Sequence, residues 1–208
     1  NLSARILISS SLLYGYDDLK ILHSRFASKR LVNADGGQSE RSFGPVMSNL
    51  TRPIYVEAMV KMILGDRWTL LADWNGWDLE RDDKKRLEVK QSAARQPWSA
   101  ALGSKPSPAR FDIAPRKGYW TDDGSRWVDQ VGRFADVYVF AHHPVFDEDL
   151  CDQRDSAQWQ FWILPTPKLP ESQKSIGIDR LTKLGAIEAS HQTLGSAVQR
   201  ALDSNPTP

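Results

Sequence analysis

The feature that most constrains the fold is a pair of short alternating segments joined by a charged turn. Residues 77–80 read WDLE and residues 86–91 read RLEVKQ, with five polar residues between them. Successive side chains of a strand point to opposite faces, so the leucine and valine of the second segment are expected to enter a core. Glu88 and Lys90 then face the other way. The short polar stretch predicts a turn that joins the two strands in an antiparallel hairpin.

The first segment adds a second acidic group. Trp77 and Leu79 alternate with Asp78 and Glu80, so we expect the apolar pair on one face and the acidic pair on the other. The hairpin would set the carboxylate of Asp78 beside that of Glu88 on the neighbouring strand. Two converging carboxylates on a rigid sheet offer hard oxygen ligands, which suit Mg²⁺ or Mn²⁺. The pattern is typical of a metal-dependent site that cleaves phosphodiesters.

This pattern resembles the PD-(D/E)XK, or restriction-endonuclease-like, nuclease superfamily, in which an acidic residue on one strand precedes Glu-x-Lys on the next. Asp78, Glu88 and Lys90 are the matching positions, and the resemblance covers about residues 55–92. Trp77 stands where a proline often precedes the first acid. The resemblance implies an α/β fold with a central mixed β-sheet flanked by helices. It also implies divalent-metal-dependent hydrolysis of DNA.

The resemblance gives each motif residue a role. Asp78, Glu88 and the main-chain carbonyl of Val89 would hold Mg²⁺ or Mn²⁺, and the ion would lower the pKa of its water. Lys90 would orient or deprotonate the attacking water, or neutralise charge on the phosphate. The plainer alternative is a solvated charged hairpin in which Glu88 and Lys90 are surface residues.

Three further residues are candidate accessory groups. Glu57 lies on a predicted helix before the sheet, where members of the superfamily often place a glutamate; alternatively it pairs with Lys61 one turn away. Gln91 and Ser92 follow the motif lysine directly. Ser92 is expected on the same face of the strand as Glu88 and Lys90. It would either contact a phosphate or only form hydrogen bonds at the end of the sheet.

Composition limits the classes of function. The chain has 208 residues, a formal net charge of +1 and one cysteine, Cys151. A single cysteine excludes an internal disulfide framework and Cys-rich zinc modules. No apolar run approaches the length of a membrane helix, and no convincing signal peptide is visible. We therefore expect a cytoplasmic protein without a membrane partner; the sequence leaves a homodimer open.

The expected DNA-facing residues lie after the motif. Residues 105–133 carry several basic side chains, of which Arg110, Arg116 and Lys117 are the candidates for binding nucleic acid. Aspartates in the same stretch offset much of that charge. Aromatic rings beside basic residues can stack on unpaired bases, although large aromatics are more often core. Trp98, Trp120 and Trp127 lie in the loop-rich segment 97–127, which overlaps these basic residues.

Periodicity and turn residues predict the order of elements. The expected helices are 17–29, 53–64 and 187–202, and the further expected strands are 68–74, 110–115, 135–141 and 159–164. The superfamily has a crossover helix after the motif, but residues 97–127 are rich in Pro and Gly and favour an insertion there. We divide the chain into an N-terminal extension with one helix (1–50), a nuclease-like α/β core (51–165) and a C-terminal helical addition (166–208), forming one compact domain.

Two other functions stay open. The first is a catalytically inactive nucleic-acid-binding or assembly module that keeps the same fold. The second is a metal hydrolase centred on His142 or His143, with Asp147 and Cys151 nearby. Adjacent histidines on an extended chain point in opposite directions, which favours a structural role for both.

Overall fold

The computed structural model describes residues 31–32, 38–39, 48–71, 75–100, 103–121 and 124–204. The predicted helix at 17–29 lies outside these residues. Strands β1 (Leu31–Val32) and β2 (Gln38–Ser39) form a short antiparallel ladder of their own. None of the helices in the described ranges has the length and apolar character needed to cross a membrane.

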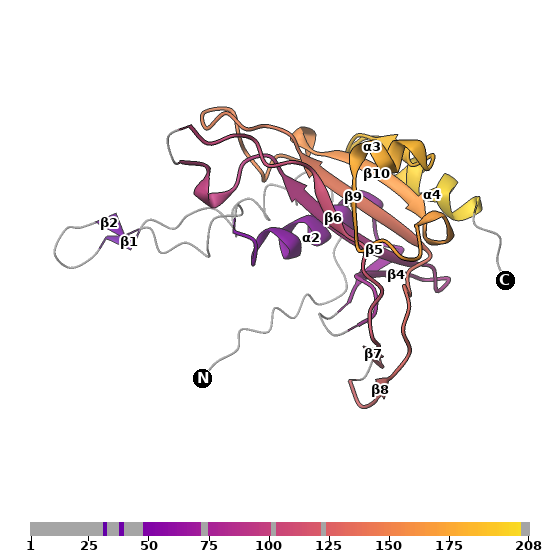
Figure 1. Cartoon of the computed structure of the whole chain (residues 1–208). Coiled ribbons are helices and arrows are strands. Elements are labelled where there is room, and N and C mark those ends of the chain that lie inside the picture. The colour runs from indigo at the N-terminus through magenta and orange to yellow at the C-terminus, as the bar shows by residue number, and fades with distance from the viewer. Residues whose placement is uncertain are drawn as a thin grey trace.

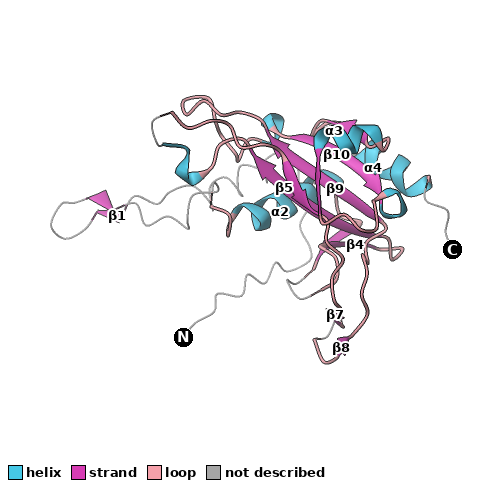
Figure 2. Ribbon diagram, viewed as in Figure 1, coloured by secondary structure: helices cyan, strands magenta, loops and turns pink. Residues whose placement is uncertain are grey.

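A six-stranded mixed sheet forms the centre of the molecule (Figure 1; Figure 2). Its order is β12-β10-β9-β5-β4-β3, and every neighbouring pair is antiparallel except β5 and β9, which are parallel. The strands are β3 (Trp68–Leu70), β4 (Leu79–Arg81), β5 (Arg86–Ala93), β9 (Val137–His143), β10 (Gln160–Pro165) and β12 (Ile187–Ala189). The predicted α/β class, with a central mixed sheet and flanking helices, is confirmed.

Helix α2 (Arg52–Leu64) precedes the sheet, in agreement with the prediction. Pro53 stands in the first turn, where its missing amide donor removes no helical hydrogen bond. Gly65 ends the helix at a φ of 85°, a left-handed conformation that favours glycine. Val56 and Val60 are fully buried, so this side of the helix packs against the sheet.

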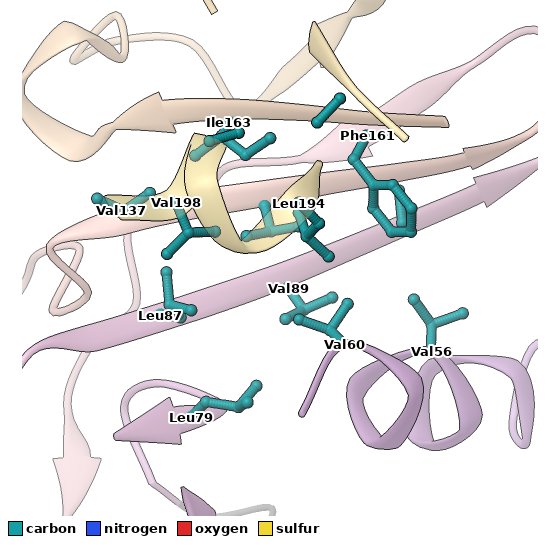
Figure 3. Packing of buried hydrophobic residues seen from close by; sticks show 14 of the residues in the cluster. Val56, Val60, Leu79, Leu87, Val89, Val137, Phe161, Ile163, Leu194 and Val198 are labelled. Atoms are coloured by element: carbon teal, nitrogen blue, oxygen red, sulfur yellow. The ribbon is translucent and has the colours of Figure 1, made fainter. Parts of the chain in front are cut away.

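The first core cluster lies between the sheet and the helices α2 and α4 (Leu194–Asp203). Figure 3 shows Val60 of α2 and Val198 of α4 on the side of the sheet that carries Leu87 and Val89 of β5. All four side chains are buried. The prediction that the leucine and valine of the motif strand enter a core is confirmed.

The second core cluster covers the opposite face of the sheet. Tyr138 and Phe140 of β9 contribute to it from the sheet. Strands β6 (Arg110–Asp112) and β11 (Ser175–Gly177) pair with each other over this face, and α3 (Ile178–Lys183) adds Leu181. The strand predicted at 110–115 is therefore present but shorter.

The crossover from β5 to the parallel strand β9 contains no α-helix among its described residues. It includes the 3₁₀ turn η1 (Pro97–Ala100), strand β6 and a hairpin of β7 (Tyr119–Trp120) and β8 (Trp127–Val128). Figure 1 shows this hairpin extending away from the central sheet. The predicted insertion without a long helix is confirmed for the described part of the crossover.

Some predicted boundaries are wrong. Residues 187–189 form β12 at the edge of the sheet, and the closing helix α4 begins only at Leu194. Pairing with β10 explains this, because main-chain hydrogen bonds along that edge fix residues 187–189 as a strand. Strand β3 ends at Leu70, and residues 72–74 of the predicted strand lie outside the described ranges. Two further 3₁₀ turns are η2 (Ser156–Gln158) and η3 (Thr166–Lys168).

Candidate active site

The chain bends where β4 begins. Leu79 pairs with Leu87 in the β4–β5 ladder, and the Leu87 carbonyl also accepts a hydrogen bond of 2.9 Å from the Asp78 amide. Asp78 and Leu79 thus both lie opposite Leu87. This arrangement is a β-bulge, which bends the strand at that point. The predicted sharing of one face by Trp77 and Leu79 is therefore wrong: Leu79 belongs to the first core cluster and Trp77 to the second.

The bulge brings the Asp78 carboxylate to the edge of β5. Its Oδ2 accepts a hydrogen bond of 2.7 Å from the amide of Val89. In a strand the N–H and C=O of one residue point to the same side, so the Val89 carbonyl also points toward the β4 side of β5. Two of the three predicted metal ligands, the Asp78 carboxylate and the Val89 carbonyl, thus lie next to each other.

Glu88 faces the second core cluster and is only 2% exposed. Its Oε1 accepts hydrogen bonds from Lys90 Nζ at 2.5 Å and from Arg116 Nη2 at 2.8 Å. Its Oε2 is buried without a hydrogen-bond partner among the described residues. The alternative in which Glu88 is a solvated surface residue is therefore wrong, while Lys90 is partly exposed.

The two acidic groups of the motif interact electrostatically. Burial raises the pKa of Asp78 to about 7, and the negative charge of Glu88 adds to that rise. Lys90, the Val89 amide and Arg116 act in the opposite direction but do not cancel it. Because a pKa near 7 reflects an unfavourable carboxylate charge, a cation beside Asp78 would relieve it.

An open pocket of about 470 Å³ lies between the first half of α2 and strand β5. Leu50 and Ile54, both exposed, give it an apolar side. Its polar side chains are Glu57, Asp78, Lys90, Gln91, Asp112 and Arg116. The pocket therefore gathers four of the predicted catalytic and accessory residues from α2, the bulge and β5.

The other predicted site residues lie elsewhere. Ser92 is buried beyond the pocket, on the same face of β5 as the motif glutamate, where it stands opposite His142 in the β5–β9 ladder. Arg110 and Lys117 are exposed on the surface and do not line the pocket. Arg116, predicted only as a nucleic-acid-binding residue, lines the pocket itself.

Two polar residues of the pocket were not predicted as parts of the catalytic group. Arg116 reaches Glu88 from the crossover; burial opposes its charge, but the Glu88 charge and hydrogen bond raise the pKa of Arg116. Asp112 comes from β6, and its Oδ1 accepts a hydrogen bond of 2.9 Å from the Ala114 amide. No local pattern marks either residue, because only the return of the crossover over the sheet brings them to the motif.

Buried Arg52 ties the start of α2 to the end of β5. Its Nη2 donates to Gln96 Oε1 at 2.9 Å and to Asn49 Oδ1 at 3.1 Å, and its Nη1 donates to Gln91 Oε1 at 3.5 Å. Burial lowers the pKa of this guanidinium to about 10. These bonds connect the helical wall of the pocket to its strand wall.

The histidine pair does not form a joint site. His143 is fully buried; its Nε2 lies 3.0 Å from Gln158 Oε1, and its ring meets Trp159 edge to face. His142 occupies the opposite face of β9, near Ser92 of β5. Burial lowers the pKa of both rings. The predicted opposite orientation of the two histidines is confirmed.

Comparisons of the chain with protein-family models, with curated proteins and with solved structures find no match. Asp78, Lys90, Glu57 and Arg116 line the pocket, and Glu88 lies behind it, bonded to Lys90 and Arg116.

Proposed function

We propose that the protein hydrolyses DNA phosphodiesters with a divalent metal ion and has a restriction-endonuclease-like core. The observation that carries the proposal is the shared pocket of Glu57, Asp78 and Lys90, with the Glu88 carboxylate bonded directly to Lys90. The order of elements supports it: a helix, three antiparallel strands, then a strand parallel to the third. The crossover departs from the superfamily because its described residues contain no α-helix.

The ligands at hand fit Mg²⁺ or Mn²⁺. Among the residues that the structure describes, no three His, Cys, Asp or Glu side chains are grouped to hold a metal. Mg²⁺ is commonly bound by one or two carboxylates plus water and substrate phosphate, which matches Asp78, Glu88 and the Val89 carbonyl. The unpartnered Oε2 of Glu88 and the raised pKa of Asp78 both favour a nearby cation. When bound, the ion would supply an acidified water and neutralise phosphate charge.

Lys90 is placed to act on the reacting groups. Its ammonium has three donors, and one of them is used by Glu88 Oε1. Because Lys90 also lines the pocket and is partly exposed, its remaining donors can reach a water or a phosphate oxygen. It would orient or deprotonate the attacking water, or stabilise charge that develops on the phosphate.

Arg116 and the exposed basic residues would hold the nucleic acid. Arg116 uses one nitrogen for Glu88, and a guanidinium has five donors in a planar fork, so it can also bind a phosphate in the same pocket. Arg110 and Lys117 lie at the surface on either side of it in sequence. Their proposed role is to position the phosphate backbone rather than to read bases.

Cleavage of DNA by a Lys90→Ala protein tests this function. Purified wild type should nick or cut plasmid or single-stranded DNA in Mg²⁺ or Mn²⁺, and Lys90→Ala should lower the rate at least about a hundredfold. The matched control is Lys183→Ala, which removes an exposed lysine of α3 outside the pocket and should leave the rate unchanged.

Because Lys90 also neutralises buried Glu88, the variant must be shown to fold. Circular dichroism and the melting temperature give that check, and Lys90→Arg keeps the positive charge while losing a group that can release its proton. Undiminished cleavage by Lys90→Ala, with contaminating nuclease excluded, contradicts the proposed site.

One observation favours a second candidate, a non-catalytic nucleic-acid-binding module. Lys90 and Arg116 both donate to Glu88 Oε1, so two cations already neutralise this carboxylate within the protein. A structural triad of this kind needs no metal. Absence of both cleavage and metal binding in a folded protein that still binds DNA would favour this candidate.

A further inference from the structure

The β7–β8 hairpin and its base, called here the tryptophan arm (described residues 116–121 and 124–132), present two paired indole rings. Trp120 and Trp127 face each other across the ladder, with ring centroids 5.7 Å apart and planes at 66°. Their exposed fractions are 40% and 44%. Figure 1 shows the hairpin standing clear of the sheet, so the exposed ring surfaces are reachable by a large ligand.

The rings are held in place by the hairpin itself. A Cβ at Gly118 would lie 2.6 Å from Cζ2 of Trp127 and 2.2 Å from the Val128 carbonyl oxygen, so the Trp127 ring packs directly on the main chain of this glycine. Trp120 supports the same ring from the neighbouring strand. A ring fixed in advance loses little conformational freedom when it binds a flat partner.

The base of the arm is part of the pocket. Arg116 and Gly132 close the arm with paired main-chain hydrogen bonds of 2.8 and 3.0 Å, and the Arg116 side chain bonds to Glu88. Tyr119 packs against Phe134, with ring centroids 4.6 Å apart. These contacts fix the base of the arm beside the pocket. A ligand strand bound along the arm would therefore lead toward Asp78 and Lys90.

We propose that the tryptophan arm binds unpaired bases by stacking on Trp120 and Trp127, which makes single-stranded or locally unpaired DNA the substrate class. This inference rests on the proposed nuclease function. Two exposed cations are near the rings in sequence, since Arg126 precedes Trp127 directly and Lys117 lies three residues before Trp120; they can meet the phosphates of the stacked nucleotides.

The small size of the exposed aromatic surface favours a base over a protein partner. Two rings exposed to this extent offer about 200 Å² together. A stable protein interface buries about 800 Å² on each partner. Stacking of single bases needs no larger area, because each stacked base contributes about 1–3 kcal/mol.

Binding of a labelled single-stranded thymidine oligonucleotide in metal-free buffer tests the inference. Fluorescence anisotropy would compare wild type with the double variant Trp120→Ala, Trp127→Ala, and a duplex of the same length would be titrated in parallel. The double variant should bind the single strand at least about tenfold more weakly and the duplex within about twofold of wild type. Trp98→Ala is the matched control, since this tryptophan is 61% exposed but lies on η1, and it should change neither affinity.

Two further variants test the arm without removing an aromatic ring. Trp127→Phe keeps an aromatic face and should retain most of the single-strand affinity. Gly118→Ala would force apart the Trp127 ring and the Val128 main chain, so it should weaken binding by disturbing the hairpin. Equal single-strand affinity of wild type and double variant, no binding by wild type, or an equal loss for duplex would overturn the inference. A mass measured by light scattering that falls only in the double variant would overturn it too, since the arm would then join two copies of the chain.

The outcome is independent of catalysis, because no metal is present and no cleavage is read. Lys183→Ala, which lies outside both the arm and the pocket, should bind the oligonucleotide like wild type. Normal binding by the double variant together with loss of cleavage in Lys90→Ala would contradict the role of the arm but support the proposed nuclease function. Binding through the arm without any cleavage would support the role of the arm but contradict the nuclease function.

Discussion

Strand β5 has two faces that are both buried but differ in chemistry. On one face Leu87 and Val89 pack between α2 and α4 in an entirely apolar cluster. On the other face Glu88 is just as deeply buried, yet it is surrounded by Lys90 and Arg116 and lies beside a bulge that carries a carboxylate. One face of the strand thus packs in the apolar core, whereas Lys90 on the other face lines the pocket and holds the buried Glu88 carboxylate.

The difference separates residues that stabilise the fold from residues that cost stability. Burial of Leu87 contributes favourable free energy in proportion to its apolar area. Burial of ions is different, because the loss of hydration of two charges offsets much of their attraction. Asp78, with a pKa raised to about 7, is destabilising in its charged form. We attribute the presence of this destabilising carboxylate beside a pocket to a functional role of its negative charge.

The largest expected effect is on the apolar face. Leu87→Ala should lower the free energy of unfolding by about 3–5 kcal/mol, because it leaves a cavity in a fully buried cluster. Asp78→Asn, on the polar face, should hold or raise the stability of the metal-free protein. Urea unfolding of both variants measures these changes. Equal losses of unfolding free energy in the two variants would contradict the difference between the two faces.

The second effect concerns pH and should be smaller. Since the pKa of Asp78 is about 7 in the folded protein and lower in the unfolded chain, the folded state holds a proton that the unfolded state has released. The contribution of Asp78 to stability should therefore fall as pH rises from about 4 to about 7, by on the order of 2–4 kcal/mol, and level off above that.

The comparison with Asp78→Asn isolates this contribution. His142 and His143, whose pKa values are lowered by burial, make stability rise with pH in part of the same window. They are present in both proteins, so the difference in unfolding free energy between the variant and wild type should grow from pH 4 to pH 7. A difference that stays constant across that window would mean that Asp78 is not perturbed.

Local patterns were sufficient to predict much of the fold. Proline at the start of α2, glycine at its end and the period-two alternation of β5 identified the helix and the motif strand. Residues 187–189 were wrongly assigned to a helix because their strand conformation depends on pairing with β10, a contact that no local window contains. Tertiary pairing overrides local propensity in such short segments.

The site was predictable where its residues are close in sequence. Asp78, Glu88 and Lys90 follow from alternation across one hairpin, although the bulge at Asp78 was not foreseen and changed the face of Trp77. Arg116 lies 28 residues from Glu88, and nothing in its neighbourhood indicates a partner on β5. Its role depends on how the crossover folds back, which sequence periodicity does not encode.

In the proposed metal site, Asp78 and Glu88 hold a divalent ion beside β5. Thermal unfolding with and without Mn²⁺ tests it in wild type, Asp78→Asn and Asp112→Asn, the last of which removes another carboxylate of the same pocket. At a hundredfold excess over Kd, the ion should stabilise wild type by about 2.7 kcal/mol. We expect this response in wild type and Asp112→Asn and its loss in Asp78→Asn. An equal response in wild type and Asp78→Asn would place the ion elsewhere and contradict the proposed metal site.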